Sequence, residues 1–149
     1  MTDEYTVFDI ANWFLHKEEM TPKKLQKMTY YAQAWSNALF NKPLMNTTFE
    51  AWRHGPVSHE LYNKYKQYGW NNIPRVENLT NEFTNKVIDL LESVWITYGD
   101  KNGDELEALT HQELPWITAR MGLQPEDSSN IPISDEVMRK FYLSIYAGD

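Results

Sequence analysis

The segment after Thr21 and Pro22 constrains the fold of this chain most strongly. Thr21 can cap the free N–H groups at the start of a helix, and Pro22 has the backbone angle of a first helical residue. Tyr30 and Tyr31 widen the apolar face that follows, so we predict a central helix in contact with several neighbours. This helix ends near Asn41, before Pro43, and its face recurs at helical spacing: Leu25, Met28, Ala32, Trp35 and Leu39.

The same periodicity predicts five more helices. The first carries an apolar face from Val7 to Leu15, and the last follows the capping residue Ser134. Residues 104–110 are expected to form only one or two short turns. The other helices are one after Pro56 that carries Val57 and ends at Gly69, one from Thr80 to Gly99, and one from Pro115 to Gly122.

Residues 46–53 fit either an extended segment or a helical turn, and the sequence does not decide between them. No other segment shows the alternation of a half-buried strand, and there is no internal repeat. We therefore predict an all-α fold, a single compact domain of about six to seven helices with at most a minor β element. One such domain is expected to span residues 1–149.

Composition excludes several classes of protein. The chain has 149 residues and no cysteine, so cysteine proteases, cysteine zinc sites and iron–sulfur clusters are excluded. A domain of this size buries roughly two thirds of the surface that its unfolded chain exposes, enough for a core without disulfides. No apolar run approaches the ~20 residues of a membrane span, and the N-terminus is acidic. We expect a cytoplasmic protein with no membrane partner.

The negative charge, −7 overall, belongs almost entirely to the second half of the chain. Residues 1–75 contain nine Lys or Arg and seven Asp or Glu, whereas residues 76–149 contain five and fourteen. An acidic half repels phosphates and does not favour nucleic acid as a partner. The one basic cluster, Lys23, Lys24 and Lys27, fits a solvated helix face.

Few residues fit catalytic chemistry. His54 and His59 do not have the spacing of the helical metal motif, and His111 with Glu113 lacks the further ligands of a zinc site. There is no Gly-x-Ser-x-Gly turn and no glycine-rich phosphate loop. We expect no metal, no cofactor and no catalytic residue. The alternative is a hydrolase built from His54, His111 and Glu113, which requires these three side chains to converge.

The stretch Ala-Trp-Arg-His-Gly-Pro-Val at residues 51–57 contains a sharp turn. Glycine permits backbone angles closed to other residues, and the proline after it can begin a helix. The turn therefore determines where Trp52 and Arg53 point. Trp52 fits core packing, but a fixed tryptophan–arginine surface is also typical of a binding hot spot.

A second stretch, Leu-Thr-His-Gln-Glu-Leu-Pro-Trp, occupies residues 109–116. Thr110 can cap a short turn, and Pro115 can end that turn and begin the next helix. His111 fits a hydrogen-bonding role at the break before Pro115. Trp116, like Trp52, fits either core packing or a binding surface.

Several motifs follow one another in a fixed order along the chain. They are Asp9-Ile10-Ala11, Trp13-Phe14-Leu15, the stretch from Leu25 to Gln33, Pro43-Leu44, Phe49-Glu50-Ala51-Trp52, Gly55-Pro56-Val57, Leu61-Tyr62 with Tyr65, Tyr98-Gly99, and Thr110-His111 through Glu113, Pro115 and Trp116. Their order and spacing, from about Val7 to Tyr146, resemble the Panacea domain family, also described as SocA-like antitoxins or phage-associated GepA-type proteins. The chain departs from the family pattern at Met28, where a leucine is common, and at His54, where a tyrosine is more usual.

The resemblance implies an antitoxin that neutralises a cognate protein toxin, encoded nearby, by binding it directly. A SocA-like member of the family delivers its toxin to a protease, so a proteolytic adaptor is one alternative. A phage accessory protein that binds a host factor is another. The sequence leaves the oligomeric state open.

Aromatic and arginine side chains supply most of the binding energy of protein interfaces, and an acidic partner favours a basic toxin. We therefore predict that the toxin contacts one face of the central helix together with the turn before Gly55. The predicted toxin-binding residues are Lys24, Lys27, Tyr31, Trp52, Arg53 and His54.

Overall fold

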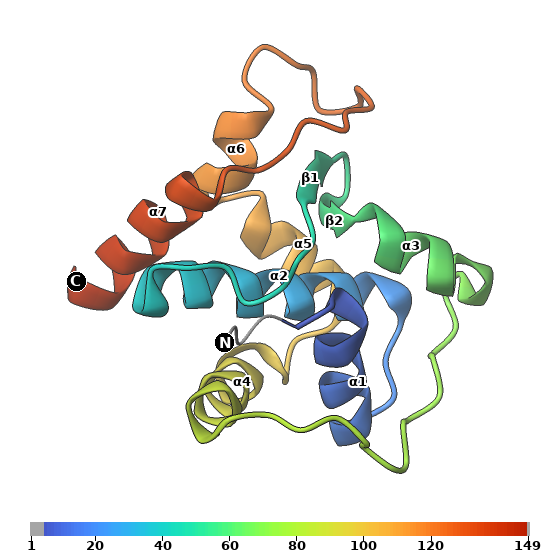
Figure 1. The fold of residues 1–149 in the computed structure, drawn as a ribbon. Helices are drawn as coiled ribbons and strands as arrows, with labels where there is room; N and C mark the ends of the chain where they lie inside the picture. The colour runs from blue at the N-terminus through green and yellow to red at the C-terminus, as the bar shows by residue number, and fades with distance from the viewer. Residues whose placement is uncertain (1–4, 149) are drawn as a thin grey trace.

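The computed structural model describes residues 5–148, which are mainly helical (Figure 1). The predicted all-α class with a minor β element is confirmed. The two strands form one small antiparallel sheet. Within the described residues the elements are α1 (Val7–Lys17), α2 (Pro22–Phe40), β1 (Phe49–Trp52), β2 (Gly55–Ser58), α3 (His59–Tyr65), a 3-10 helix η1 (Lys66–Tyr68), α4 (Asn85–Tyr98), α5 (Gly103–Thr110), α6 (Leu114–Ala119) and α7 (Asp135–Gly148).

Helix α2 crosses the middle of the molecule, as predicted (Figure 1). Thr21 caps it by accepting a hydrogen bond from the Lys24 N–H, and Asn41 ends it in the left-handed conformation with φ 58°. It packs against α1, α3, α4, α5, α7 and β2. One residue of the predicted apolar face is misplaced, because Leu39 near the end of the helix is 41% exposed.

Two glutamine side chains of α2 bind the backbone of the chain that follows the helix. Oε1 of Gln33 accepts hydrogen bonds from the N–H groups of Leu44 and Met45, and its amide donates to the Met45 carbonyl. Gln26 does the same for Ser58, whose N–H donates to Oε1 at 2.9 Å and whose carbonyl accepts from Nε2 at 3.0 Å. Both glutamines are buried, so the chain between these points is held against α2 without a wider sheet.

The prediction of a helix directly after Pro56 is wrong, because residues 55–58 form β2 and the helix begins at His59. Residues 46–53, left open by the sequence, are extended at their end, where β1 pairs with β2 from Phe49 opposite Ser58 to Trp52 opposite Gly55. Pro56 has no backbone N–H to donate to a neighbouring strand. On the outer edge of β2 the side chain of Gln26, and not another strand, binds the backbone of Ser58.

Other boundaries differ from the predictions in detail. Thr84, not Thr80, caps α4, because the chain stays extended up to Thr84 and the Val87 N–H reaches its hydroxyl. Residues 103–110 form a full helix and not short turns, since Asn102 and Glu105 make a capping box at its start. The predicted first helix, the end of α4 at Gly99 and the Ser134 cap of α7 are confirmed. The predicted end at Gly122 is wrong, because α6 already ends at Ala119 with Arg120 as its C-cap, and Gly122 lies in the turn that follows.

No helix within residues 5–148 combines the length and hydropathy needed to cross a membrane.

The hairpin depends on Gly55, which has φ +114°. A Cβ at this position would also lie 2.5 Å from Cε of Lys27. We expect Gly55→Ala to lower the free energy of unfolding by about 3 kcal/mol through strain and overpacking. Gly122 has a positive φ but open space around it, so Gly122→Ala should cost about 1 kcal/mol. Equal losses for the two variants in urea denaturation would contradict this account.

Candidate functional site

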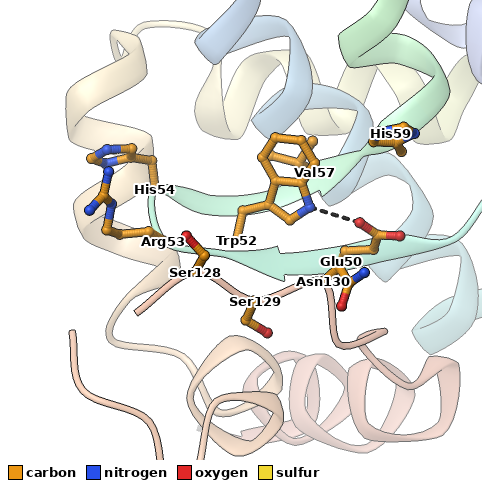
Figure 2. A pocket seen from close by; sticks show the side chains of 9 residues that line it. All are labelled: Glu50, Trp52, Arg53, His54, Val57, His59, Ser128, Ser129 and Asn130. Atoms are coloured by element: carbon orange, nitrogen blue, oxygen red, sulfur yellow. Dashed lines mark hydrogen bonds between the residues drawn. The ribbon is translucent and has the colours of Figure 1, made fainter. Parts of the chain in front are cut away.

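The turn of the hairpin presents three consecutive side chains, Trp52, Arg53 and His54, which we call the hairpin tip (Figure 2). Arg53 and His54 are exposed and Trp52 is half-buried. The Trp52 indole N–H donates to Oε1 of Glu50 at 2.8 Å, and its ring packs edge-on against Tyr62 at 5.0 Å between centroids. The tip therefore has a defined orientation, and two of its side chains are exposed where a partner could reach them.

A loop faces the tip across an open cavity of about 680 Å³. Ser128, Ser129 and Asn130 form the loop side, as Figure 2 shows. The guanidinium of Arg53 donates to the Glu126 carbonyl at 3.2 Å, so the tip and this loop are in contact at one end.

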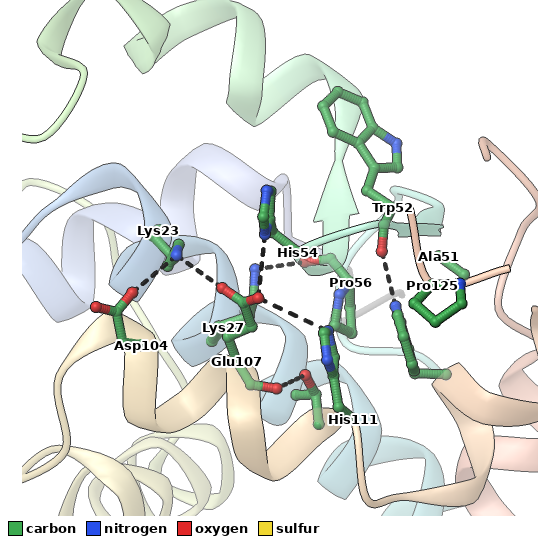
Figure 3. A network of polar contacts seen from close by, with 12 residues as sticks. Lys23, Lys27, Ala51, Trp52, His54, Pro56, Asp104, Glu107, His111 and Pro125 are labelled. Carbon is green, nitrogen blue, oxygen red and sulfur yellow. Dashed lines mark hydrogen bonds and ion pairs between the residues drawn. The ribbon is translucent and has the colours of Figure 1, made fainter. Parts of the chain in front are cut away.

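Beneath the tip, Glu107 of α5 is the centre of a polar network (Figure 3). Its Oε1 accepts from Nζ of Lys23 at 2.7 Å, and Lys23 also binds Asp104 at 2.8 Å. Its Oε2 lies 3.1 Å from Nδ1 of His54 and 4.0 Å from Nε2 of His111. Burial acts to raise the pKa of Glu107, but the hydrogen bonds from Lys23 and His54 outweigh it and hold that pKa below its usual value.

Lys27 lies buried beside this network. Its aliphatic chain passes over Gly55, and Nζ donates to the Pro56 carbonyl at 3.3 Å. Burial lowers the pKa of Lys27 to about 7, against the opposing effect of the Glu107 charge.

The stretch at residues 109–116, together with Arg120, supports the tip from below. Trp116 donates its indole N–H to the Trp52 carbonyl at 2.8 Å and stacks on His111 at 3.8 Å between ring centroids. Burial lowers the pKa of His111, which favours the neutral ring. Arg120, itself buried, donates to the Ala51 carbonyl at 3.0 Å and to the Asp127 carbonyl at 2.7 Å. These contacts join the strand before the tip to the loop that faces it.

Glu113 serves a different cluster. Its Oε1 accepts hydrogen bonds from the hydroxyls of Tyr31 at 2.9 Å and Tyr142 at 2.7 Å, and Tyr142 also pairs with Tyr30. Burial raises the pKa of Glu113, although the two phenol hydrogen bonds act in the opposite direction. The side chain therefore links α2 and α7 inside the core.

The proposed hydrolase constellation does not assemble as such. His54 and His111 both approach Glu107, whereas the carboxylate of Glu113 is bound by Tyr31 and Tyr142. Within residues 5–148 no group of three His, Asp or Glu side chains is placed to hold a metal ion.

The predicted toxin-binding residues separate into two groups. Lys27 and Tyr31 are buried and have no surface to offer a partner directly. Lys24 is turned away toward α4, where Nζ donates to the Gly99 carbonyl at 2.6 Å and lies over the Trp95 ring. The hairpin tip alone combines exposure with a fixed orientation.

The residues named for the two motif stretches act as structural supports. Gly55, Pro56 and Val57 form β2, and all three are buried. Thr110 ends α5 and donates its hydroxyl to the Glu107 carbonyl, so it does not cap a turn as expected. Pro115 is the second residue of α6, beside Trp116.

Sequence reasoning missed Gln26, Glu107 and Arg120, and it assigned Lys23 to a solvated helix face although Lys23 pairs with Asp104 and Glu107. Spacing offered a signal for two of them, since Glu107 precedes His111 by one helical turn and Arg120 follows Trp116 by the same interval. For Gln26 there was none, because its partner Ser58 is distant in the sequence.

A family model described as "Antitoxin SocA-like, Panacea domain" matches residues 25–117. Since the match covers more than half of the chain, the protein belongs to this family of SocA-like antitoxin domains. The resemblance is thereby confirmed, over a shorter span than the motifs suggested. The matched segment begins in α2 and ends in α6, and so contains the hairpin and the Glu107 network. Its description is that of an antitoxin domain and not of an enzyme. No curated protein and no solved structure matches the chain.

Lys27 makes stability depend on pH in a defined direction. The pKa of Lys27 is about 7 in the folded chain and 10.5 in its ordinary state. Between these two pH values the folded chain binds fewer protons at Lys27 than the unfolded chain, so the free energy of unfolding rises with pH. We expect this contribution to add about 2 kcal/mol to the free energy of unfolding between roughly pH 7.5 and 9. Lys27→Met should lack it, whereas the exposed control Lys140→Met should follow the wild-type curve. Parallel curves for wild type and Lys27→Met would contradict the lowered pKa.

Glu113 is expected to act through its acceptor oxygen. Glu113→Ala leaves two buried phenol hydroxyls without this acceptor and should lower the free energy of unfolding by about 3 kcal/mol. Glu113→Gln keeps a carbonyl oxygen in place and should cost much less. Chemical denaturation followed by tryptophan fluorescence distinguishes the two, and an equal cost would argue against the hydrogen-bonding role.

Proposed function

We propose that the protein is the antitoxin of a toxin–antitoxin pair and neutralises its toxin by direct binding, with the hairpin tip at the centre of the contact. The proposal rests on one observation: a member of an antitoxin family carries an exposed hairpin tip of fixed orientation. It presents an exposed arginine and histidine beside a half-buried tryptophan. Tryptophan and arginine are the residue types that dominate binding hot spots.

The support beneath the tip favours binding by a preformed surface. Trp116 and Arg120 hold the carbonyls of Trp52 and Ala51, and Glu107 holds the ring of His54. A side chain that is already ordered loses less entropy when a partner binds. The tip therefore offers more binding energy than three residues of a mobile loop would.

The charge distribution favours a basic toxin. The second half of the chain, residues 76–149, carries most of the net charge of −7, which attracts a positively charged partner and accelerates association. We place this encounter in the cytoplasm and expect the partner to be a protein, not a nucleic acid or a membrane.

Co-expression with the product of the adjacent gene tests the proposal. We expect growth inhibition by that product to be relieved by the wild-type chain, with a complex that co-purifies. Arg53→Glu should weaken the complex at least about tenfold, roughly 1.4 kcal/mol, while Lys140→Glu on α7 makes the same charge change outside the tip and should not. Thermal unfolding of each variant checks that it is folded.

Other outcomes identify the alternative functions. Relief of toxicity with loss of the toxin and no stable complex would indicate a proteolytic adaptor. No toxicity from the adjacent gene would favour a phage accessory protein that binds a host factor. Full neutralisation and unchanged affinity with Arg53→Glu would show that the tip is not the contact.

A further inference from the structure

A second hollow lies between the N-terminal part of α2, the hairpin and α3, and continues past η1 to Trp70. It encloses about 380 Å³ and differs in character from the cavity of Figure 2. Its walls are mainly apolar, with aromatic rings from β1, from α3 and from the turn after η1. We call it the aromatic groove and define it by Trp52, Tyr62, Tyr65 and Trp70 around Val57 and Leu61.

The rings on its rim are unusually exposed. Trp70 is 84% exposed and Tyr62 is 40% exposed. Gly69, with φ +58°, turns the chain at the end of η1 and places Trp70 at the surface. A cluster of exposed aromatic side chains around a hollow marks an interaction site, since scattered exposure of single apolar residues is the usual case on a free surface.

Within residues 5–148, basic side chains line the groove and acidic ones do not. The basic residues are Lys23, Lys27, Lys66 and His54, in a chain with a net charge of −7. Nζ of Lys23 lies 5.7 Å from the ring centre of Trp70, and Nζ of Lys66 lies 6.0 Å from that of Tyr62. Lys23 is paired with acidic residues behind the groove, while Lys66 has no acidic partner among the described residues. An anionic occupant would pair with Lys66, and a cationic one would be repelled by it.

We propose that the aromatic groove binds an acidic segment of the partner protein, with a bulky apolar side chain of that segment seated between Trp52, Tyr62 and Trp70. Carboxylates beside that side chain lie within reach of Lys66 and Lys23. The inference rests on the proposed function in one respect, that the physiological partner is a protein. The groove would be a second contact with the toxin, in addition to the one made by the acidic half of the chain. The toxin would then carry an acidic segment, which binds the groove, as well as a basic surface.

The walls favour a peptide over a nucleic acid. Valine, leucine and proline side chains occupy the floor and sides, and they offer no hydrogen bonds to bases or phosphates. Asp104 and Glu107 already pair with Lys23, so within the described residues Lys66 is the exposed groove lysine without an acidic partner, which suits a few carboxylates better than a continuous run of phosphates.

Selection from a phage-displayed library of random twelve-residue peptides tests the groove without the natural partner. Wild type serves as bait, and Trp70→Ala, which alters an exposed side chain, serves for counter-selection. We expect the enriched peptides to be net negative and to carry Trp, Phe or Leu. Synthetic copies should bind Trp70→Ala and Lys66→Glu at least tenfold more weakly in fluorescence anisotropy, while Lys66→Arg and the distant charge reversal Lys140→Glu should bind almost as wild type does. Basic consensus peptides, or no enrichment over Trp70→Ala, would overturn the proposal.

Three further measurements separate failure of the groove from failure of the proposed function. If Arg53→Glu weakens the toxin complex but Trp70→Ala and Lys66→Glu do not, the groove is not a contact with the toxin, while the proposed antitoxin function stands. If selected peptides bind the groove but the product of the adjacent gene forms no complex, the groove is a peptide-binding site and that product is not the partner. A fluorescent single-stranded RNA or DNA oligonucleotide that competes with the peptide and binds more tightly would overturn the peptide assignment.

Discussion

Two amide side chains on one helix hold the non-helical part of this domain in place. Gln26 and Gln33 each present an oxygen and an N–H to backbone that would otherwise lie unpaired against a helix. Backbone of this kind is costly to bury, because every unpaired N–H and carbonyl loses its water. The two glutamines remove that cost, and the hairpin can therefore exist as two short strands on a helical core. The tip, the Glu107 network and the aromatic groove all depend on this arrangement.

Local sequence patterns predicted the elements whose formation is itself local. The central helix followed from Thr21, Pro22 and its apolar spacing, and the last helix from the Ser134 cap. The strand at residues 55–58 could not be predicted in this way, because its partners are Gln26 and a strand that the sequence left undecided. Pro56 fits a helix start and an edge strand equally well, and only the tertiary contact decides. Similarly, Thr80 and Thr84 are both possible caps, and the extended path before α4 selects the second.

The sequence did not show which polar residues of the candidate site are buried. Lysine is commonly exposed, and Tyr31 was assigned both to the apolar face of the central helix and to the toxin contact, but the helix that carries Lys27 and Tyr31 is enclosed on most sides. Their burial is possible because Pro56 and Glu113 offer acceptors, and these lie 29 and 82 residues further along the chain. Trp52, Arg53 and His54 were identified correctly as a fixed turn, since glycine at the next position determines the backbone there. Their role in binding stays a prediction.

The support of the hairpin tip also sets an order of events during synthesis. The Ala51 N–H donates to the Ile131 carbonyl, and the Phe49 carbonyl accepts from the Ile133 N–H, so the outer edge of β1 is completed by chain made much later. Trp116 and Arg120 likewise reach the tip from downstream. Contacts of such long sequence separation form late, because loop closure must precede them. A nascent chain that has not yet exposed residues 116–133 would therefore have its central helix but no finished tip.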